Sequence, residues 1–578
     1  MNLYLIRILL LSAVQVCLVI ADLENWPTRS FDLQVQQRAQ RDVSYSIPID
    51  QSTQFGVSVK ALVFEEYGYS TSALPSFNGL LNMGIEVLTI DLYYNNFTSK
   101  WQLCPAPFPL NQTSTSISTI HNLEWNGKTY KCEPDFTPST LMAEIRDFIT
   151  GTNTNMDANY LQILYRLNHF TYPKRTLNST VDLNKIYKST SSPYNVLGNA
   201  TLSDTMSLLG PYLFTPTDLK TFRASTSEED RYFYNQSDET FPSLEQFIFT
   251  DLKRATVAVI YDEVTSNPAW YNYTSSDNQT IFINNGSVNL TLTSMADSEF
   301  VQTCVDDYLN SSNIDSGTDF QRLSLDTHFR YAYDDDTSAF DDTKFRAMIR
   351  CGYSPILNSS TYSIDDFNQN NIGEIINHYV PLSSWAWSPK SANVKSEGNY
   401  SMDDESKDNE AVRCVLVYEH GWYVGNCYDT YPFACQHSDN PTEWIIRNVK
   451  KSYFDAEKGC PKDYTFGISR SSMEMLSLME AIAASDVDFP VWIDVNDITV
   501  INCFVTGGPY ADCPYQRTVS TKGLAGLIAP SFVVAVVVLL LLSLEKIFRV
   551  NPIQTNRKRF WKKKINEHNK TEYEGVPS

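Results

Sequence analysis

The chain has 578 residues, of which 42% are hydrophobic and 13% aromatic, so it holds enough apolar side chains for several folded domains. Its formal net charge is −22. Because residues 1–21 contribute +1 and residues 545–578 contribute +5, the part between them carries −28. This acidic balance excludes nucleic acid as a partner, since phosphate groups are repelled and no basic groove is available.

A secretory signal peptide is predicted at residues 1–21. Arg7 precedes an apolar stretch from Ile8 to Ile20, and the small side chain of Ala21 fits a cleavage site. We therefore expect the chain to enter the secretory pathway.

Residues 22–345 are predicted to form an α/β domain. Strands are expected at 56–64, 84–92 and 255–261, and helical spacing occurs at 75–83, 141–149 and 160–167. Apolar strands that alternate with helices are typical of a parallel sheet covered on both faces. A segment of this length favours closure into a (β/α)8 TIM barrel.

Cysteine and tryptophan become frequent after residue 345. We divide this α+β part into a module at 346–440 and a membrane-proximal, cysteine-bearing segment at 441–522. Ten cysteines follow the signal peptide, an even number, and disulfide bonds are their expected state in an oxidising compartment. A zinc site is the weaker alternative, because the sequence contains no Cys-x-x-Cys pair.

One transmembrane helix is predicted at 523–544. These 22 residues contain no charged side chain, and about 20 helical residues cross the hydrocarbon core of a bilayer. Nine basic side chains in residues 545–578 predict a cytoplasmic tail. Together with the signal peptide, the helix predicts a single-pass type I membrane protein whose N-terminal part is lumenal or extracellular.

Twelve Asn-x-Ser/Thr sequons precede this helix and predict a glycoprotein. They are Asn96, Asn111, Asn178, Asn199, Asn235, Asn272, Asn278, Asn285, Asn289, Asn310, Asn358 and Asn399.

Two stretches of the first domain resemble phosphatidylinositol-specific phospholipase C. Residues 46–52 resemble the Ile-Pro-Gly-Thr-His opening of that family, and residues 81–91 resemble its second strand. The resemblance implies a phospholipase C-like TIM barrel. It also implies that Gln51 and Pro105 stand where that family has two catalytic histidines, and neither can transfer a proton. We therefore expect a pseudoenzyme without a cofactor.

Six carboxylates lie at or near predicted strand ends, where barrel enzymes form their sites. They are Glu65, Glu66, Glu86, Asp91, Asp262 and Glu263. Glu86 and Asp91 are weak candidates for metal ligands, although structural roles are favoured for both. A phosphodiesterase-like hydrolase that uses these carboxylates is one alternative function.

Residues 385–389 and 414–436 resemble the second half of a C-type lectin-like domain. That resemblance implies a disulfide bond between Cys414 and Cys427. It implies for Cys435 a bond to Cys351, which we favour, or to Cys460. The calcium-binding triplets of sugar-binding members are missing, so we expect no calcium. A calcium-independent glycan binder that uses Trp385, Trp387 and Trp422 is a further alternative, although core packing is the commoner role of such side chains.

The order of signal peptide, degenerate barrel, lectin-like module, one span and basic tail resembles the fungal maintenance of telomere capping protein 6 family. Its most specific stretch runs from Gly84 to Pro109. The resemblance implies an indirect role in telomere capping. We expect a non-catalytic binding or structural module, integral to the membrane, with a protein or glycan as its ligand.

Overall fold

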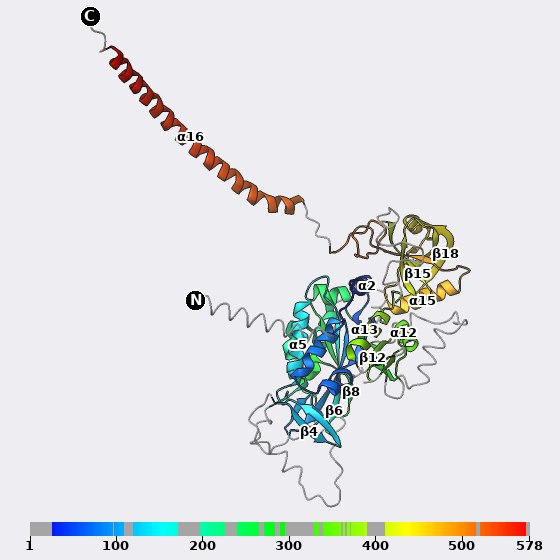
Figure 1. Ribbon diagram of the computed structural model, residues 1–578. Helices are drawn as coiled ribbons and strands as arrows, with labels where there is room; N and C mark the ends of the chain where they lie inside the picture. Colours follow the sequence, from blue (N-terminus) through cyan, green and yellow to red (C-terminus); the bar gives the residue numbers. More distant parts are fainter. Residues whose placement is uncertain are drawn as a thin grey trace, which may run out of the picture. The chain divides into compact units, whose positions relative to one another are not determined.

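The computed structural model of the protein describes most of the chain (Figure 1). The described residues are 26–95, 98–108, 119–170, 197–225, 240–264, 271–283, 290–294, 329–334, 339–359, 362–364, 367–369, 371–389, 411–515 and 521–573. They fall into two compact units, residues 1–513 and residues 514–578. The predicted signal peptide lies outside the described residues.

A curled, mainly parallel sheet forms the first half of unit 1. Its order is β10-β11-β12-β1-β2-β6-β8-β7, with β3 added to β2 and β9 added to β8. The strands are β1 (Gly56–Ser58), β2 (Val87–Asn95), β3 (Lys100–Gln102), β6 (Leu161–His169), β7 (Leu213–Phe214), β8 (Ala255–Asp262), β9 (Phe282–Ile283), β10 (Thr291–Ser294), β11 (Arg330–Tyr333) and β12 (Ser354–Leu357). Every pair is parallel except β2 with β3, as a TIM barrel requires.

Helices cover this sheet because its strands are apolar on both faces. Along β2, Leu88, Ile90 and Leu92 belong to the large core shared with the helices, whereas Val87 belongs to a separate core inside the curled sheet. Side chains of a strand alternate between faces, so Thr89 and Asp91 point inward with Val87. The main covering helices are α4 (Leu74–Asn82), α5 (Pro138–Gly151), α7 (Leu202–Met206), α8 (Pro216–Ser225), α12 (Asp342–Arg350) and α13 (Ile372–Leu382).

Two predicted elements are wrong. The segment at 160–167 is not a helix but the strand β6, which lies beside β8 (Figure 1). Its helical spacing was accidental, because the polar side chains of Gln162, Arg166 and Asn168 fall on alternate residues, as in a strand. The strand expected at 56–64 ends at Ser58 and continues as a π-helix from Lys60 to Phe64.

The domain boundary at residue 345 is also wrong. The strand β12 pairs in parallel with both β1 and β11, and α12 and α13 pack against each other beside it. The parallel-sheet domain therefore continues to about Leu382.

A six-stranded mixed sheet forms the second half of unit 1, in the order β16-β15-β20-β17-β18 with β19 added to β17. Its elements are β15 (Val412–Tyr418), β16 (Gly421–Asn426), β17 (Tyr431–His437), β18 (Trp444–Lys451), β19 (Tyr464–Phe466), α15 (Ser472–Ala483) and β20 (Val491–Asn496). The strand β20 lies between β15 and β17. The two segments divided at residue 440 therefore form one domain.

The N-terminal helix α2 (Phe31–Val43) helps to join the two sheets. Arg38 donates a hydrogen bond to the carbonyl of Asn502 at 3.0 Å, and Ser44, one residue after the helix, donates to the carbonyl of Arg470 at 2.7 Å. Thr53 and Ser472 form a buried hydroxyl pair at 2.7 Å. Together with a hydrophobic core that contains residues of both halves, these contacts hold the two sheets in one compact unit.

Three tryptophans pack against one another where the segment after the first sheet meets the second sheet. The ring of Trp422 in β16 meets Trp385 and Trp387 edge to face, with centroids 5.7 and 5.5 Å apart. The backbone approaches closely here: Gly421 has φ = +126°, and a Cβ atom would lie 2.6 Å from the carbonyl oxygen of Ala386. All three tryptophans are buried, so they are core residues rather than an exposed glycan surface.

Unit 2 contains the helix α16 (Thr521–Tyr573). Within it, Ala529–Lys546 is long and apolar enough to cross a membrane, and this window buries no surface within the protein. It overlaps the predicted span at 523–544. The basic segment after it continues the same helix to Tyr573.

We predict that Trp422→Ala lowers the free energy of unfolding by about 3–5 kcal/mol, because a fully buried ring is replaced by a cavity. Denaturant titration of the purified protein measures this difference. Tyr428→Ala is the matched control, since that side chain is 69% exposed, and it should change stability little. Equal effects of the two substitutions would contradict the described packing.

Candidate functional site

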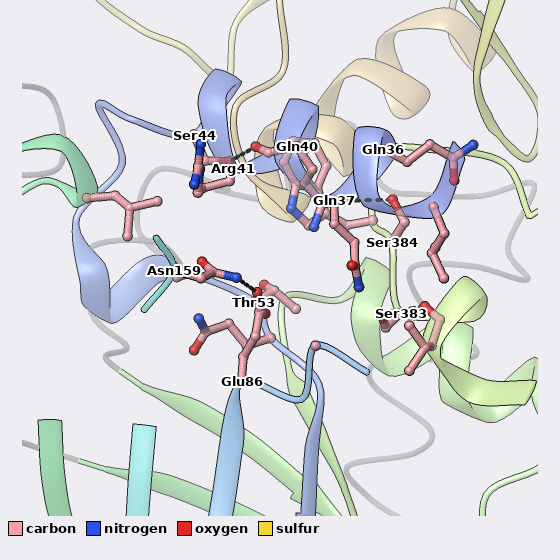
Figure 2. Close-up of a pocket in the computed structure, with 17 residues that line it drawn as sticks. Gln36, Gln37, Gln40, Arg41, Ser44, Thr53, Glu86, Asn159, Ser383 and Ser384 are labelled. Carbon is pink, nitrogen blue, oxygen red and sulfur yellow. Dashed lines mark hydrogen bonds between the residues drawn. The ribbon is translucent and has the colours of Figure 1, made fainter. Parts of the chain in front are cut away.

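Two adjoining cavities lie beneath α2, at the N-terminal ends of the barrel strands. Their volumes are about 140 and about 50 Å³, and both are lined by Gln37, Arg41, Glu86 and Asn159. Figure 2 shows Glu86 at the start of a strand, facing the helix that carries Gln37 and Arg41. The smaller cavity is also lined by Gln36, Gln40, Ser44, Thr53, Ser383 and Ser384. Amide and hydroxyl groups therefore dominate it.

Two arginines of these cavities, Arg41 and Arg254, donate most of their hydrogen bonds to backbone carbonyls. Arg41 donates to the carbonyls of Asn155, Met156 and Ala158, and pairs with Asp42 at 2.8 Å. Arg254 donates to the carbonyls of Asn159 and Thr152 at 2.9 and 3.1 Å. Both side chains fix the loop that leads into β6.

Glu86 is the unusual acid of this region. Burial raises its pKa to about 7, while the hydrogen bond from Asn159 and the charges of Arg29 and Arg41 act in the opposite direction. A carboxyl group in a cavity that titrates near neutrality is a candidate for proton transfer. However, Glu86 lies at the N-terminal end of the strands, where TIM barrels hold residues that serve stability.

Because the pKa of Glu86 is raised from 4.5 to about 7, its ionisation in the folded protein is unfavourable. The free energy of unfolding is therefore highest below about pH 4.5, where Glu86 is protonated in both the folded and the unfolded chain. It falls as the pH rises and levels off above about pH 7. Glu86→Gln should therefore match the wild type at about pH 4 and be more stable by about 3 kcal/mol at about pH 8.

Denaturant titration at both pH values measures this change. Glu124→Gln, at an exposed position on β4 (His121–Trp125), is the control. A difference between Glu86→Gln and wild type that does not vary with pH would contradict the assignment.

The second polar group runs from the first half and middle of β2 to the C-terminal ends of β6, β8 and β12. We call Thr89, Asp91, Arg166, Asn168, Tyr261 and Asn358 the mouth site. Asn168 donates to Asp91 Oδ1 at 3.0 Å, and Arg166 donates to Asn358 Oδ1 at 3.4 Å. The guanidinium of Arg166 lies 5.5 Å from the centre of the Tyr261 ring. Neighbouring strands thus bring together an acid, a base and two amides at the end of the barrel that usually carries function.

Further carboxylates border this site. Asp262 accepts hydrogen bonds from the hydroxyl of Tyr273 at 2.6 Å and from the backbone of Val264 at 2.9 Å. Glu263 accepts from Tyr261 and lies 3.5 Å from His169. These contacts orient both acids.

Asp334, directly after β11, accepts backbone hydrogen bonds from Asn358 and Phe340. Burial raises the pKa of Asp334 to about 6, and the hydrogen bonds from Asn358, Tyr362 and Phe340 oppose that rise. This acid therefore fixes the backbone at Asn358, one edge of the mouth site.

The structure does not bring the six candidate carboxylates together. Glu86 precedes β2 and Asp91 lies five residues further along the chain, which separates them by about 16 Å. Glu65 and Glu66 are exposed on α3 (Glu65–Tyr67). Among the described residues, no three His, Cys, Asp or Glu side chains are placed to hold a metal ion.

Gln51 lies at the other end of the barrel from the mouth site. It precedes β1, is buried, donates to Asp50 at 3.0 Å and accepts from Arg330 at 3.2 Å. The presence of glutamine rather than histidine at position 51 therefore neither supports nor excludes catalysis at the mouth site. Pro105 is buried next to the disulfide-bonded Cys104, after a strand that pairs with the C-terminal half of β2.

The expected disulfide bond between Cys414 and Cys427 is present. The favoured bond between Cys351 and Cys435 is wrong, because Cys435 is bonded to Cys460. The β17·β19 pairing brings these two cysteines together within one domain. Cys104–Cys132 and Cys503–Cys513 are also bonded.

Four sequons lie within the described residues. Asn272 and Asn278 are exposed, as glycan attachment requires. Asn199 and Asn358 are half-buried, with side chains hydrogen-bonded to Ser139 and Arg166. The other eight, which are Asn96, Asn111, Asn178, Asn235, Asn285, Asn289, Asn310 and Asn399, lie outside the described residues.

Comparison with known proteins identifies the relatives of this chain. Residues 27–381 match the family description "MTC6 partial TIM-barrel domain". The chain is 41% identical to "Maintenance of telomere capping protein 6" of Debaryomyces hansenii, covering 99% of this chain and 98% of that protein. The protein of the same name from Candida tropicalis is also 41% identical, over 98% and 99% of the two chains.

The chain belongs to this family. A more distant relative of the same name, from Komagataella phaffii, is 27% identical over 96% of this chain and 97% of its own length. The family resemblance expected from the sequence is confirmed. The matched TIM-barrel region ends at residue 381, which agrees with the end of α13 rather than with a boundary at 345.

The sequence did not single out Thr89, Arg166, Asn168 or Asn159. Arg166 and Asn168 fell in a segment expected to be helical. The alternation of Gln162, Leu164, Arg166 and Asn168 with apolar side chains was the signal of an inward-facing strand.

Proposed function

We propose that the protein is a single-pass type I membrane glycoprotein of the secretory pathway. In this proposal its lumenal or extracellular part is a non-catalytic binding module, and α16 holds it in the membrane. The relatives are named for maintenance of telomere capping, so we extend that role to this chain. The role would be indirect, because a lumenal domain has no access to chromosome ends.

The proposed membrane topology rests on where the disulfide bonds and the basic residues lie relative to the apolar window. All four described disulfide bonds precede the apolar window Ala529–Lys546, and seven of the residues from 557 to 570 are Lys or Arg. Disulfide bonds persist in oxidising compartments, and basic residues favour the cytoplasmic side. Both preferences support an orientation in which the disulfide-bonded part lies in the lumen or outside the cell and the basic segment lies in the cytosol.

The non-catalytic role is supported by how the described acids are used. Asp262 and Glu263 are hydrogen-bonded to tyrosines, and Glu86 is held by Asn159 at the far end of the strands. We further propose that the second domain is C-type lectin-like. The bonds Cys414–Cys427 and Cys435–Cys460 and the buried Trp422 support this assignment.

Protease protection in sealed membranes tests the topology. We predict that a tag after Ser578 is digested without detergent, whereas a tag within residues 411–513 is protected and the chain is sensitive to endoglycosidase. Asn272→Gln and Asn278→Gln should each increase mobility by one glycan. Digestion of the 411–513 tag in intact vesicles would reject the proposal.

Hydrolysis assays test the non-catalytic role. We predict that the purified protein releases no product from phosphatidylinositol or glycerophosphodiesters above the level of an Asp91→Asn variant. Turnover that depends on Asp91 or Glu86 would show that the barrel is an enzyme.

A further inference from the structure

Two buried polar atoms on the inward face of β2 have no hydrogen-bond partner within the described residues. They are Thr89 Oγ1 and Asp91 Oδ2, on side chains that are 2% and 4% exposed. The two residues are two positions apart on one strand, so their side chains lie on the same face. Buried polar groups are almost always hydrogen-bonded, and these two atoms therefore mark a place where a ligand or water belongs.

The mouth site surrounds these atoms with groups whose bonds leave capacity for a ligand. Asp91 is in register with Arg166 on the adjacent strand, and its other oxygen is held by Asn168 at 3.0 Å. Arg166 has one hydrogen bond to Asn358, which at 3.4 Å is long. A guanidinium has five N–H donors, so Arg166 has donors left to offer.

The mouth site reaches the surface. Arg166, Asn168 and Asn358 are half-buried, and Tyr261 is 39% exposed. The buried Asp91 is therefore bordered by polar side chains that are themselves partly exposed to solvent.

Charge and aromatic content restrict the class of ligand. Asp91, Asp262 and Glu263 outnumber Arg166, so a phosphate or another anion is disfavoured. Tyr261 offers a ring face beside Arg166, and the buried Tyr93 stacks on Phe170. Burial and the nearby Asp91 raise the pKa of Tyr93, which keeps its hydroxyl protonated. Aromatic faces, amides and carboxylates together suit a neutral ligand that has several hydroxyl groups and apolar C–H faces.

We propose that the mouth site binds a neutral carbohydrate. Sugar hydroxyls donate to Asp91 Oδ2 and exchange a hydrogen bond with Thr89 Oγ1, while Arg166 donates to sugar oxygens. This inference rests on the proposed binding role of the protein and names the ligand class of its barrel.

The test uses the full-length protein in detergent micelles with glucose, mannose, galactose, N-acetylglucosamine and their neutral oligosaccharides as probes. Glucose 6-phosphate and inositol phosphate serve as anionic probes. We expect at least one neutral sugar to bind and to raise the melting temperature. Asp91→Asn should weaken that binding at least tenfold, and Thr89→Val several-fold.

Thr89→Val and Asp91→Asn also separate binding from folding. Because the two atoms have no protein partner, both variants should melt at or above the wild-type temperature while losing affinity. Asp429→Asn is the matched control, since this exposed acid on the second domain should change neither property.

Three results would overturn the proposal: no neutral sugar binds, the variants bind as wild type does, or a phosphorylated probe binds more tightly than its neutral counterpart. Lower melting temperatures for Thr89→Val without any sugar-dependent shift would indicate structural water only, which also rejects it. Hydrolysis of a bound sugar would contradict the non-catalytic role but leave the carbohydrate site standing.

Discussion

Four disulfide bonds are the constraint on which the rest of the account depends. Within the described residues they join loops and strands that lie 10 to 28 residues apart in the chain, and three of them lie in the second domain. Two of these three bonds, Cys414–Cys427 and Cys435–Cys460, lie in a smaller core within that domain, where they link neighbouring segments covalently. Disulfide bonds persist in oxidising compartments, which supports the proposed position of unit 1 on the side of the membrane away from the cytosol.

The two ends of the barrel have separate roles in this account. At the N-terminal ends of the strands, α2 and the arginines beneath it hold the loop before β6 and contact the second domain. Most polar groups there have protein partners, which fits a structural contact between the two domains better than a ligand-binding site. In the mouth site, Thr89 and Asp91, in the first half and at the middle of β2, retain oxygen atoms without a partner among the described residues, and Asn168 holds the other oxygen of Asp91. What distinguishes the mouth site is a pair of buried oxygen atoms on one face of β2 that lack a partner among the described residues, rather than the presence of acids.

The sequence predicted the parallel sheet and the apolar helix because long apolar runs leave strong local signals, and it predicted the family because the stretch from Gly84 to Pro109 is specific. The prediction from sequence failed where one pattern of apolar residues fits two different secondary structures. A doubly buried strand resembles a buried helix at 160–167, and β12 and β20 are short strands whose sheet partners lie far away in the chain. The partner of Cys435 and the inward direction of Asp91 depend on such long-range register, which local spacing does not encode.

Mass spectrometry of the non-reduced protein, purified from its native membrane after alkylation of free thiols, shows whether these disulfide bonds form in the cell. The account predicts peptides linked through Cys104–Cys132, Cys414–Cys427, Cys435–Cys460 and Cys503–Cys513. Alkylated, unpaired cysteines at these eight positions would place unit 1 in a reducing compartment and contradict the account.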